Sequence, residues 1–435
     1  MLLIYISKIT PRNRYAVKAV FRNILEFSDF QITSDVDRFE EHVGPRLSYG
    51  KKPLGSEVFV FATGLLEKKG IDEQSFDISE YEDTITLFAH KAKSALPFDV
   101  FSAVFFMLSR YEEYLPHRRD HYDRFIAKES FAFEKGFLQT AVVDRWAIFL
   151  KQAILKENPG TKFPEKEFKY IPTIDIDNTF AYKEKGLIRT VGSYLKNLAK
   201  FDFKHLKQQT LVLLRREKDP FDTYNYQLNI QKRYNLNPIY FILLADYGLN
   251  DKNLSHENRT FQSLIKSIAD YAQVGIHPSF GSNSDASKLH TEILRLENIV
   301  KRDITRSRQH FLKLSLPETY RNLLEEDILE DYTMGFAGEV GFRAGTCSPF
   351  PFYDLDEEVE CKLTVYPFQV MESTFKYYQK KGVTDSIEAI KSIIDEVKAV
   401  NGTFVSLWHN ESLSNLEEWK GWRNVYEEMV AYAHK

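Results

Sequence analysis

The sequence is poor in cysteine, in long apolar runs and in excess charge of either sign, and each scarcity excludes a class of protein. Only Cys347 and Cys361 are present among 435 residues, which allows one bridge but no disulfide framework and is typical of a reducing compartment. No apolar run approaches the roughly 20 residues of a transmembrane helix. The formal net charge of −4 excludes the strongly basic balance of a general nucleic-acid-binding protein.

The N-terminus lacks the pattern of a secretory leader. A leader has roughly 7–15 apolar residues behind a basic segment, whereas the apolar run that starts at Met1 is broken at Lys8. We therefore expect a first β-strand here and a cytoplasmic protein without a membrane span.

The composition is sufficient for two folded domains. Hydrophobic residues make up 43% of the chain and charged residues 28%, which is typical of a globular protein. A polar stretch at 156–162 predicts a boundary between a first domain, residues 1–165, and a second, residues 166–435. Strand-like runs at 2–6, 58–61 and 84–88 and an apolar helix at 96–114 indicate an α+β or α/β accessory domain without an assigned role.

Strand-like and helical patterns alternate after residue 168, which is typical of βα units around a parallel sheet. The expected strands lie at 170–176, 238–244, 274–277, 305–312, 332–336, 361–371 and 403–409. The expected helices lie between them, at 261–272, 288–301, 317–326 and 384–400. The Lys-rich helical segment 187–235 is longer than an ordinary βα connection, so we expect it to form a lid or an outer layer beside a site.

The first strand of this half ends in two carboxylates. Asp175 and Asp177 are two residues apart, so on a strand their side chains point the same way. Two neighbouring carboxylates are costly unless a metal, a proton or a cation joins them. The alternative is that one caps the next helix while the other is solvated.

Further reactive side chains follow the later strands. His277, Arg308, His310, Arg343 and His409 all lie at or near predicted strand ends. The carboxyl ends of barrel strands meet at one face, so we expect these groups to converge with the two aspartates. Asp and His together suit Zn²⁺. A second Asp could act as a general base, a separate His as a general acid, and an Arg could orient a carboxylate.

The order of these motifs over residues 168–412 resembles the polysaccharide deacetylases, the NodB-homology superfamily also called carbohydrate esterase family 4. The strings that carry the resemblance are Thr173–Asp177, the stretch that begins at His277, Ser307–Phe311, more weakly Gly341–Arg343, and Leu407–His409. The resemblance implies a distorted (β/α)7 barrel that uses a divalent metal to remove N-acetyl or O-acetyl groups from sugars.

The resemblance also implies roles for individual residues. Asp175 would be the catalytic base, Arg308 would orient it, and His409 would be the acid for the leaving group. Asp177 and His277 would bind the metal, with zinc expected. We further expect Arg343, Trp408 and Ser279 to contact the carbohydrate.

One position departs from the family pattern. The family has a second histidine four residues after the first, and here that position is Gly281. His310 is the best candidate for the missing ligand, with Ser279 and Asp175 as weaker ones. Two interpretations stay open. The protein is either a metal-dependent hydrolase that removes an acyl group from a carbohydrate, or a catalytically inactive barrel that binds a glycan or a protein partner. Related hydrolytic chemistry, for instance on a cyclic amide, is a third option.

Overall fold

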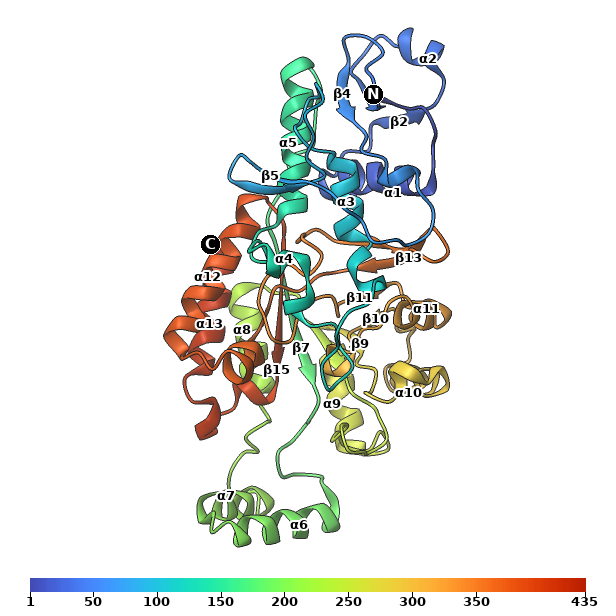
Figure 1. Ribbon diagram of the computed structural model, residues 1–435. Helices are drawn as coiled ribbons and strands as arrows, with labels where there is room; N and C mark the ends of the chain where they lie inside the picture. Colours follow the sequence, from blue (N-terminus) through green and yellow to red (C-terminus); the bar gives the residue numbers. More distant parts are fainter. The chain divides into compact units, whose positions relative to one another are not determined.

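The computed structural model describes residues 1–435 as a mixed α/β protein in which most strand pairs are parallel (Figure 1). Two compact units interleave along the chain. Unit 1 comprises 1–169, 314–369 and 392–404, and unit 2 comprises 170–313, 370–391 and 405–435. The first change of unit lies close to the boundary expected near residue 165, but the chain later returns to unit 1. The simple division at 165 therefore stays a prediction.

Unit 1 begins with a parallel sheet in the order β2-β1-β3-β4. Its strands are β1 (Leu2–Ile6), β2 (Phe30–Thr33), β3 (Arg46–Gly50) and β4 (Val58–Phe61). Helix α3 (Val100–Leu108) is buried at every position, as its continuous apolar sequence predicts. It ends sooner than expected because Arg110 has a φ of 52°, in the left-handed region that cannot continue a helix.

The remaining elements of the N-terminal part are one hairpin and several helices. They are α1 (Pro11–Lys18), α2 (Val36–Glu40), β5 (Ile78–Tyr81), β6 (Thr84–Leu87), α4 (Phe131–Glu134) and α5 (Val142–Glu157). Thr10 caps α1 by accepting a hydrogen bond from the backbone amide of Asn13.

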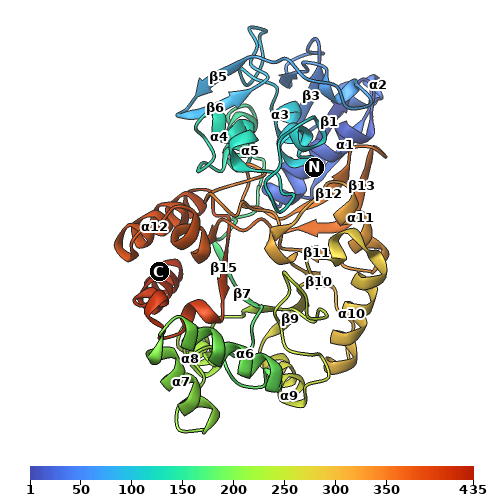
Figure 2. The same cartoon turned by 60° about the horizontal axis from the view of Figure 1, so that its bottom comes forward.

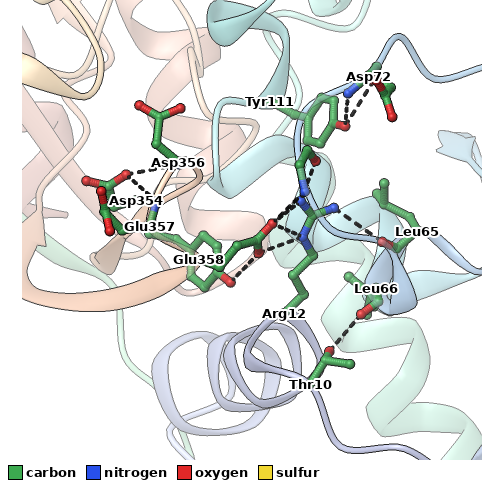
Figure 3. A network of polar contacts seen from close by, with 12 residues as sticks. Thr10, Arg12, Leu65, Leu66, Asp72, Tyr111, Asp354, Asp356, Glu357 and Glu358 are labelled. Atoms are coloured by element: carbon green, nitrogen blue, oxygen red, sulfur yellow. Dashed lines mark hydrogen bonds and ion pairs between the residues drawn. The ribbon is translucent and has the colours of Figure 1, made fainter.

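A later segment completes the core of unit 1. It contributes α11 (Glu318–Glu325), β11 (Glu330–Asp331), β12 (Phe350–Asp354) and β13 (Val359–Val365). The Tyr15 ring of α1 lies 4.8 Å from the ring of Tyr353. Arg12, which is 1% exposed, donates from Nε to Glu358 Oε2 at 2.8 Å (Figure 3). Tyr353 donates to the same oxygen at 2.9 Å. The contacts of Tyr15 with Tyr353 and of Arg12 with Glu358 join residues more than 300 positions apart in sequence.

Unit 2 is built on strands in the order β10-β9-β8-β7-β15-β14, and the pairs β10–β9, β9–β8, β8–β7 and β14–β15 are parallel. The strands are β7 (Lys169–Ile176), β8 (Ile239–Ile242), β9 (Gln273–Ile276), β10 (Arg306–Ser307), β14 (Val370–Met371) and β15 (Thr403–His409). Helices surround them, among them α8 (Tyr224–Tyr234), α9 (Arg259–Ala269), α10 (Ala286–Val300) and α13 (Trp422–His434) (Figure 2).

The parallel α/β arrangement agrees with the sequence, but a closed barrel is not confirmed. No pairing joins β10 to β14, so the strands of unit 2 form an open order. Helices α9, α10, α11 and α12 (Val383–Ala399) lie within two or three residues of their expected positions. The strand expected at 332–336 is instead the short β11 at 330–331. None of the helices combines the length and the apolar content that crossing a bilayer requires.

Candidate metal centre

The centre starts at the end of β7. Ile174 and Ile176 are buried in the core of unit 2, so Asp175 and Asp177 share the other face of the strand and its continuation. Asp175 is 1% exposed, whereas the Asp177 side chain keeps 21% of its surface accessible. The strand therefore presents one enclosed carboxylate and one that is partly open.

His277 follows β9 directly and points its Nε2 at these carboxylates. Its Nδ1 lies 2.5 Å from the carbonyl oxygen of Arg308. A carbonyl can only accept, so Nδ1 carries the hydrogen and Nε2 is left to face the aspartates. Nε2 lies 3.2 Å from Asp177 Oδ1 and 3.8 Å from Asp175 Oδ2.

His310 comes from the turn η6 (His310–Leu312) after β10, not from a strand as expected. Its Nδ1 lies 2.8 Å from Asp251 Oδ1, and its Nε2 lies 3.4 Å from Asp177 Oδ2. Asp251 also accepts a hydrogen bond from the backbone amide of Phe280 at 3.1 Å, which ties this carboxylate to the loop after His277. His310 is thus oriented from behind by a buried carboxylate.

Asp177, His277 and His310 together form a donor set that fits a metal ion. Each offers one ligand atom, and these atoms all lie within 4.8 Å of one another. Asp177 Oδ1 is buried and makes no hydrogen bond. Each histidine donates a hydrogen bond from Nδ1 to an acceptor outside the donor set, which is how metal-binding imidazoles are usually held. Two imidazoles and one carboxylate are a common zinc set in which a fourth position stays open.

The same closeness shifts the pKa values of the group. Burial works to raise the pKa of Asp177, but the neighbouring imidazoles of His310 and His277 outweigh it and hold this pKa well below the usual range. Burial works to lower the pKa of His310, but Asp177 and Asp251 outweigh it and raise this pKa to about 9. Positive charge is therefore strongly favoured between these carboxylates, whether it comes from protons or from a cation.

Arg308 fixes Asp175 beside the centre. It is fully buried, with Nη1 donating to Asp175 Oδ1 at 3.0 Å and to Thr173 Oγ1 at 2.5 Å. Its guanidinium lies over the Phe241 ring, 4.7 Å from the centroid. Asp175 Oδ1 is thus engaged by the arginine, while Oδ2 faces His277 Nε2.

His409 lies at the end of β15, and its side chain approaches Asp177. Its Nδ1 lies 2.7 Å from Oε1 of Glu372, a buried residue that follows β14 directly. Its Nε2 lies 3.8 Å from Asp177 Oδ2. Burial works to lower the pKa of His409, but Glu372 outweighs it and raises this pKa well above its ordinary value. His409 can therefore donate a proton from Nε2.

The three residues expected to contact a carbohydrate have other partners. Arg343 belongs to unit 1 and is 2% exposed, with its guanidinium on Glu113 and on the carbonyl of Gly335. Trp408 is 1% exposed and packs 5.0 Å from the Tyr426 ring. Ser279 is 4% exposed and accepts a hydrogen bond from the amide of Ser282. These are contacts of buried residues, and the substrate-binding role of the three stays a prediction.

Three supporting residues were not anticipated from the sequence: Thr173, Asp251 and Glu372. Glu372 had a usable signal, because it follows a predicted strand end as the other site residues do. Thr173 precedes Asp175 by two residues on the same strand and so shares its face. Asp251 had none, since it lies in the irregular loop between β8 and α9.

Comparison with known proteins gives two kinds of likeness. Residues 2–159 match DUF7033, a family of unknown function. No curated protein matches the chain.

Among solved structures, a protein assigned as a polysaccharide deacetylase from Mycobacterium smegmatis is 13% identical with a TM-score of 0.39, over 63% of this chain and 86% of that one. The polysaccharide deacetylase Bc1974 from Bacillus cereus is 12% identical with a TM-score of 0.28, over 61% and 86%. The Xyl-CE4 domain of a multidomain xylanase from the hindgut metagenome of Trinervitermes trinervoides is 10% identical with a TM-score of 0.26, over 61% and 82%.

Proposed function

We propose that the protein is a divalent-metal-dependent hydrolase that removes an acyl group, most simply acetyl, from a carbohydrate. One observation carries the proposal: the Asp177, His277 and His310 ligand atoms converge within 4.8 Å of one another. Asp175 and His409 each reach this group at 3.8 Å. A structural ion-pair cluster would not need an oriented acid and an oriented base beside an open donor set.

The three ligand residues would hold the ion through Asp177 Oδ and the two Nε2 atoms. A divalent ion in that position would supply Lewis acidity to an acyl carbonyl and make an attacking water more acidic. His310 takes the place of the family's second-motif histidine, which is Gly281 here. The donor set then again has three protein ligands, with the third supplied by the turn after β10.

Asp175 is suited to accept the proton of the attacking water. Arg308 occupies Oδ1, so Oδ2 is the oxygen that takes the proton. The buried arginine also fixes the rotamer of Asp175, which keeps the base in register with the donor set.

His409 is suited to deliver a proton to the departing amine or alcohol. Glu372 accepts the Nδ1 hydrogen and holds the ring so that Nε2 faces the centre. Base and acid are thus separate groups with separate orienting partners, Arg308 and Glu372, an arrangement that suits hydrolysis of an amide or ester.

The substrate class and the distorted barrel rest on the motif resemblance over residues 168–412. The strings at Thr173–Asp177 and Leu407–His409 carry it, and both lie on strands of unit 2 that deliver site residues. A carbohydrate with an acetyl group is therefore the first substrate to test.

Metal content of the purified protein is the first test. We expect about one equivalent of zinc or a similar divalent ion per chain, lost in His310→Ala. The control His290→Ala removes an exposed histidine of α10 in the same unit and should leave the metal content unchanged. A wild-type chain that takes up no divalent ion would favour the inactive, glycan- or protein-binding alternative.

Acetate release from acetylated oligosaccharides is the second test. Asp175→Asn should keep the metal and lose acetate release by about 10²–10⁴-fold, which is the usual worth of a positioned base. Equal turnover by Asp175→Asn and wild type would remove Asp175 from the mechanism.

A further inference from the structure

Helix α6 (Gly186–Ala199) exposes an entire apolar stripe. The stripe consists of Leu187, Ile188, Val191, Leu195 and Leu198, which are 86%, 90%, 53%, 62% and 53% exposed. At about 100° per residue these positions fall within one sector of roughly 100°. No residue of α6 is buried. A stripe of this kind normally packs against the core, and here nothing in unit 2 covers it.

The neighbouring helix does not use the stripe. Helix α7 (Phe203–Leu213) lies beside α6 (Figure 1), and side-chain hydrogen bonds join the two helices. Ser193 donates to Gln209 at 3.1 Å, and the hydroxyls of Tyr194 and Thr210 lie 2.7 Å apart. Further apolar side chains are exposed at and beyond the ends of α7: Phe201, Phe203 and Leu214 are 77%, 64% and 59% exposed. The hydrogen bonds between the two helices thus leave the α6 stripe and these further apolar side chains exposed.

The same hairpin is strongly basic. Residues 186–216 contain one acidic residue, Asp202, and seven basic ones: Arg189, Lys196, Lys200, Lys204, Lys207, Arg215 and Arg216. The whole chain has a net charge of −4, so positive charge is concentrated in this segment. All the basic residues except Arg189 are exposed, and only Lys204 forms an ion pair with an acidic residue, Glu417.

Arg189 attaches the hairpin to the rest of unit 2. It donates to the carbonyl oxygens of Lys252 and Asn253 and lies 4.2 Å over the Tyr247 ring. The polar side of α6 is therefore held by the protein, while the stripe on its opposite side stays accessible.

We propose that the α6–α7 hairpin, residues 186–216, is a docking surface for an anionic lipid membrane. An amphipathic helix with a wide apolar face and Lys or Arg residues around it lies in the plane of a bilayer, with its apolar face at the boundary between headgroups and acyl chains. The exposed lysines and arginines meet the lipid phosphates, which is the partner that their charge fits. A second copy would instead bring two basic surfaces together, so repulsion disfavours it. The proposal stands independently of the hydrolase function.

Co-sedimentation of the full chain with vesicles tests the surface. We expect binding to vesicles of phosphatidylcholine with about 30% phosphatidylglycerol, weak binding to phosphatidylcholine alone, and release by high salt. The double variant Ile188→Glu with Leu195→Glu should lower the partition coefficient about tenfold or more, because it places charge in the inserted face. Lys207→Ala and Arg215→Ala should each lower it about fivefold.

Matched controls distinguish binding through the hairpin from non-specific binding through other exposed apolar residues. Leu329 and Val359 are 45% and 46% exposed apolar residues of unit 1, so Leu329→Glu and Val359→Glu should bind vesicles like the wild type. Far-UV circular dichroism checks that every variant keeps its helix content.

Three results would overturn the proposal. The first is no difference between anionic and neutral vesicles. The second is equal loss of binding in the unit 1 controls. The third is a wild-type dimer that the Ile188→Glu, Leu195→Glu variant converts to a monomer without lipid, since a second copy would then cover the stripe.

Discussion

Asp251 orients the ring of His310, the proposed third metal ligand. Its carboxylate holds Nδ1 at 2.8 Å and, through the amide of Phe280, braces the loop that follows His277. Removing such an outer partner typically lowers metal affinity 10–100-fold. We expect Asp251→Ala to weaken Zn²⁺ binding by about that factor, measured by competition with a chromogenic chelator.

Asp246 gives the matched control for this prediction. It lies in the same loop, is 82% exposed and pairs with Arg295. Asp246→Ala should leave the zinc affinity unchanged. Equal affinities for Asp251→Ala and wild type would mean that His310 needs no orienting carboxylate, or is not a ligand.

Glu113 predicts a pH dependence of stability in unit 1. Burial works to raise its pKa, but Arg343 and Arg110 outweigh it and lower this pKa to about 2. A carboxyl whose folded pKa is lowered stabilises the fold above its ordinary pKa of about 4.3, and loses that contribution as the pH falls towards 2. The difference in free energy of unfolding between wild type and Glu113→Gln should therefore be largest at pH 7 and shrink between about pH 5 and pH 2.

Urea denaturation over this pH range measures the difference. At pH 7 the loss of a buried ion-pair partner should cost about 3–5 kcal/mol. Glu134→Gln, at an exposed pair with Lys135, should change the free energy of unfolding by less than about 1 kcal/mol at every pH. A Glu113→Gln effect that stays constant down to pH 2.5 would contradict the assignment.

At this scale the sequence predicted some of the residues that meet but not how each is held. Asp175, Asp177, His277 and His409 sit at the ends of regular strands, and strand ends in a parallel sheet share an edge. Arg343 was expected in the same group from its position after a predicted strand, yet the structure places it in the other unit with Glu113. Spacing along the chain cannot distinguish an arginine that faces a site from one that neutralises a buried carboxylate.

At the scale of elements, β9 depends on a glycine for its close approach to its neighbours. A Cβ at Gly275 would lie 2.7 Å from the Phe241 ring and 2.8 Å from the carbonyl oxygen of Arg306. Both contacts matter to the centre, since Phe241 lies under Arg308 and His277 follows two residues later. Gly275→Ala should destabilise the fold by about 1–3 kcal/mol and weaken metal binding, as judged by urea denaturation and zinc titration.

Gly192 is the matched control for the strand glycine. It lies within α6 with nothing within 4 Å of its would-be Cβ. Gly192→Ala should leave stability unchanged or raise it by up to about 1 kcal/mol, because Ala favours a helix over Gly. If Gly275→Ala behaved in the same way, the tight packing of β9 would not be what sets the site.

The sequence predicted most helices and strands of unit 2 because their apolar residues recur regularly along each segment. It did not predict the turn geometry at His310, where Phe311 has a φ of 60° in a left-handed conformation that no residue pattern announced. It also placed a strand at 332–336, whereas β11 occupies 330–331. Short pairings of two residues depend on neighbouring strands, so local sequence carries little information about them.

At the scale of the whole molecule, the part of the chain that matches DUF7033 shares its unit with later segments. Residues 2–159 lie in unit 1, but that unit also contains 314–369 and 392–404. The later segments neutralise charges that the first part buries, since Arg12 pairs with Glu358 and Glu113 pairs with Arg343. A boundary near 165 would cut through these pairs.

The fragment 1–165 should therefore fail to fold alone. Asp144 is 1% exposed and accepts hydrogen bonds from Thr346 and Ser348, so the fragment would leave Asp144 without these donors and Arg12 without the carboxylate of Glu358. Glu113 would keep Arg110 but lose Arg343. Each unpaired buried charge costs about 3–5 kcal/mol, so the loss of partners at Asp144 and Arg12 is comparable to the typical stability of about 5–15 kcal/mol of a whole domain.

Far-UV circular dichroism and amide proton dispersion of the fragment should show an unfolded or aggregated chain. Co-expression with residues 166–435 supplies Arg343, Glu358 and the other partners, and should recover a soluble complex. A fragment 1–165 that unfolds cooperatively on its own would show instead that the buried charges of the first part are satisfied without the later segments, and that the return of the chain to unit 1 is an addition to a complete domain.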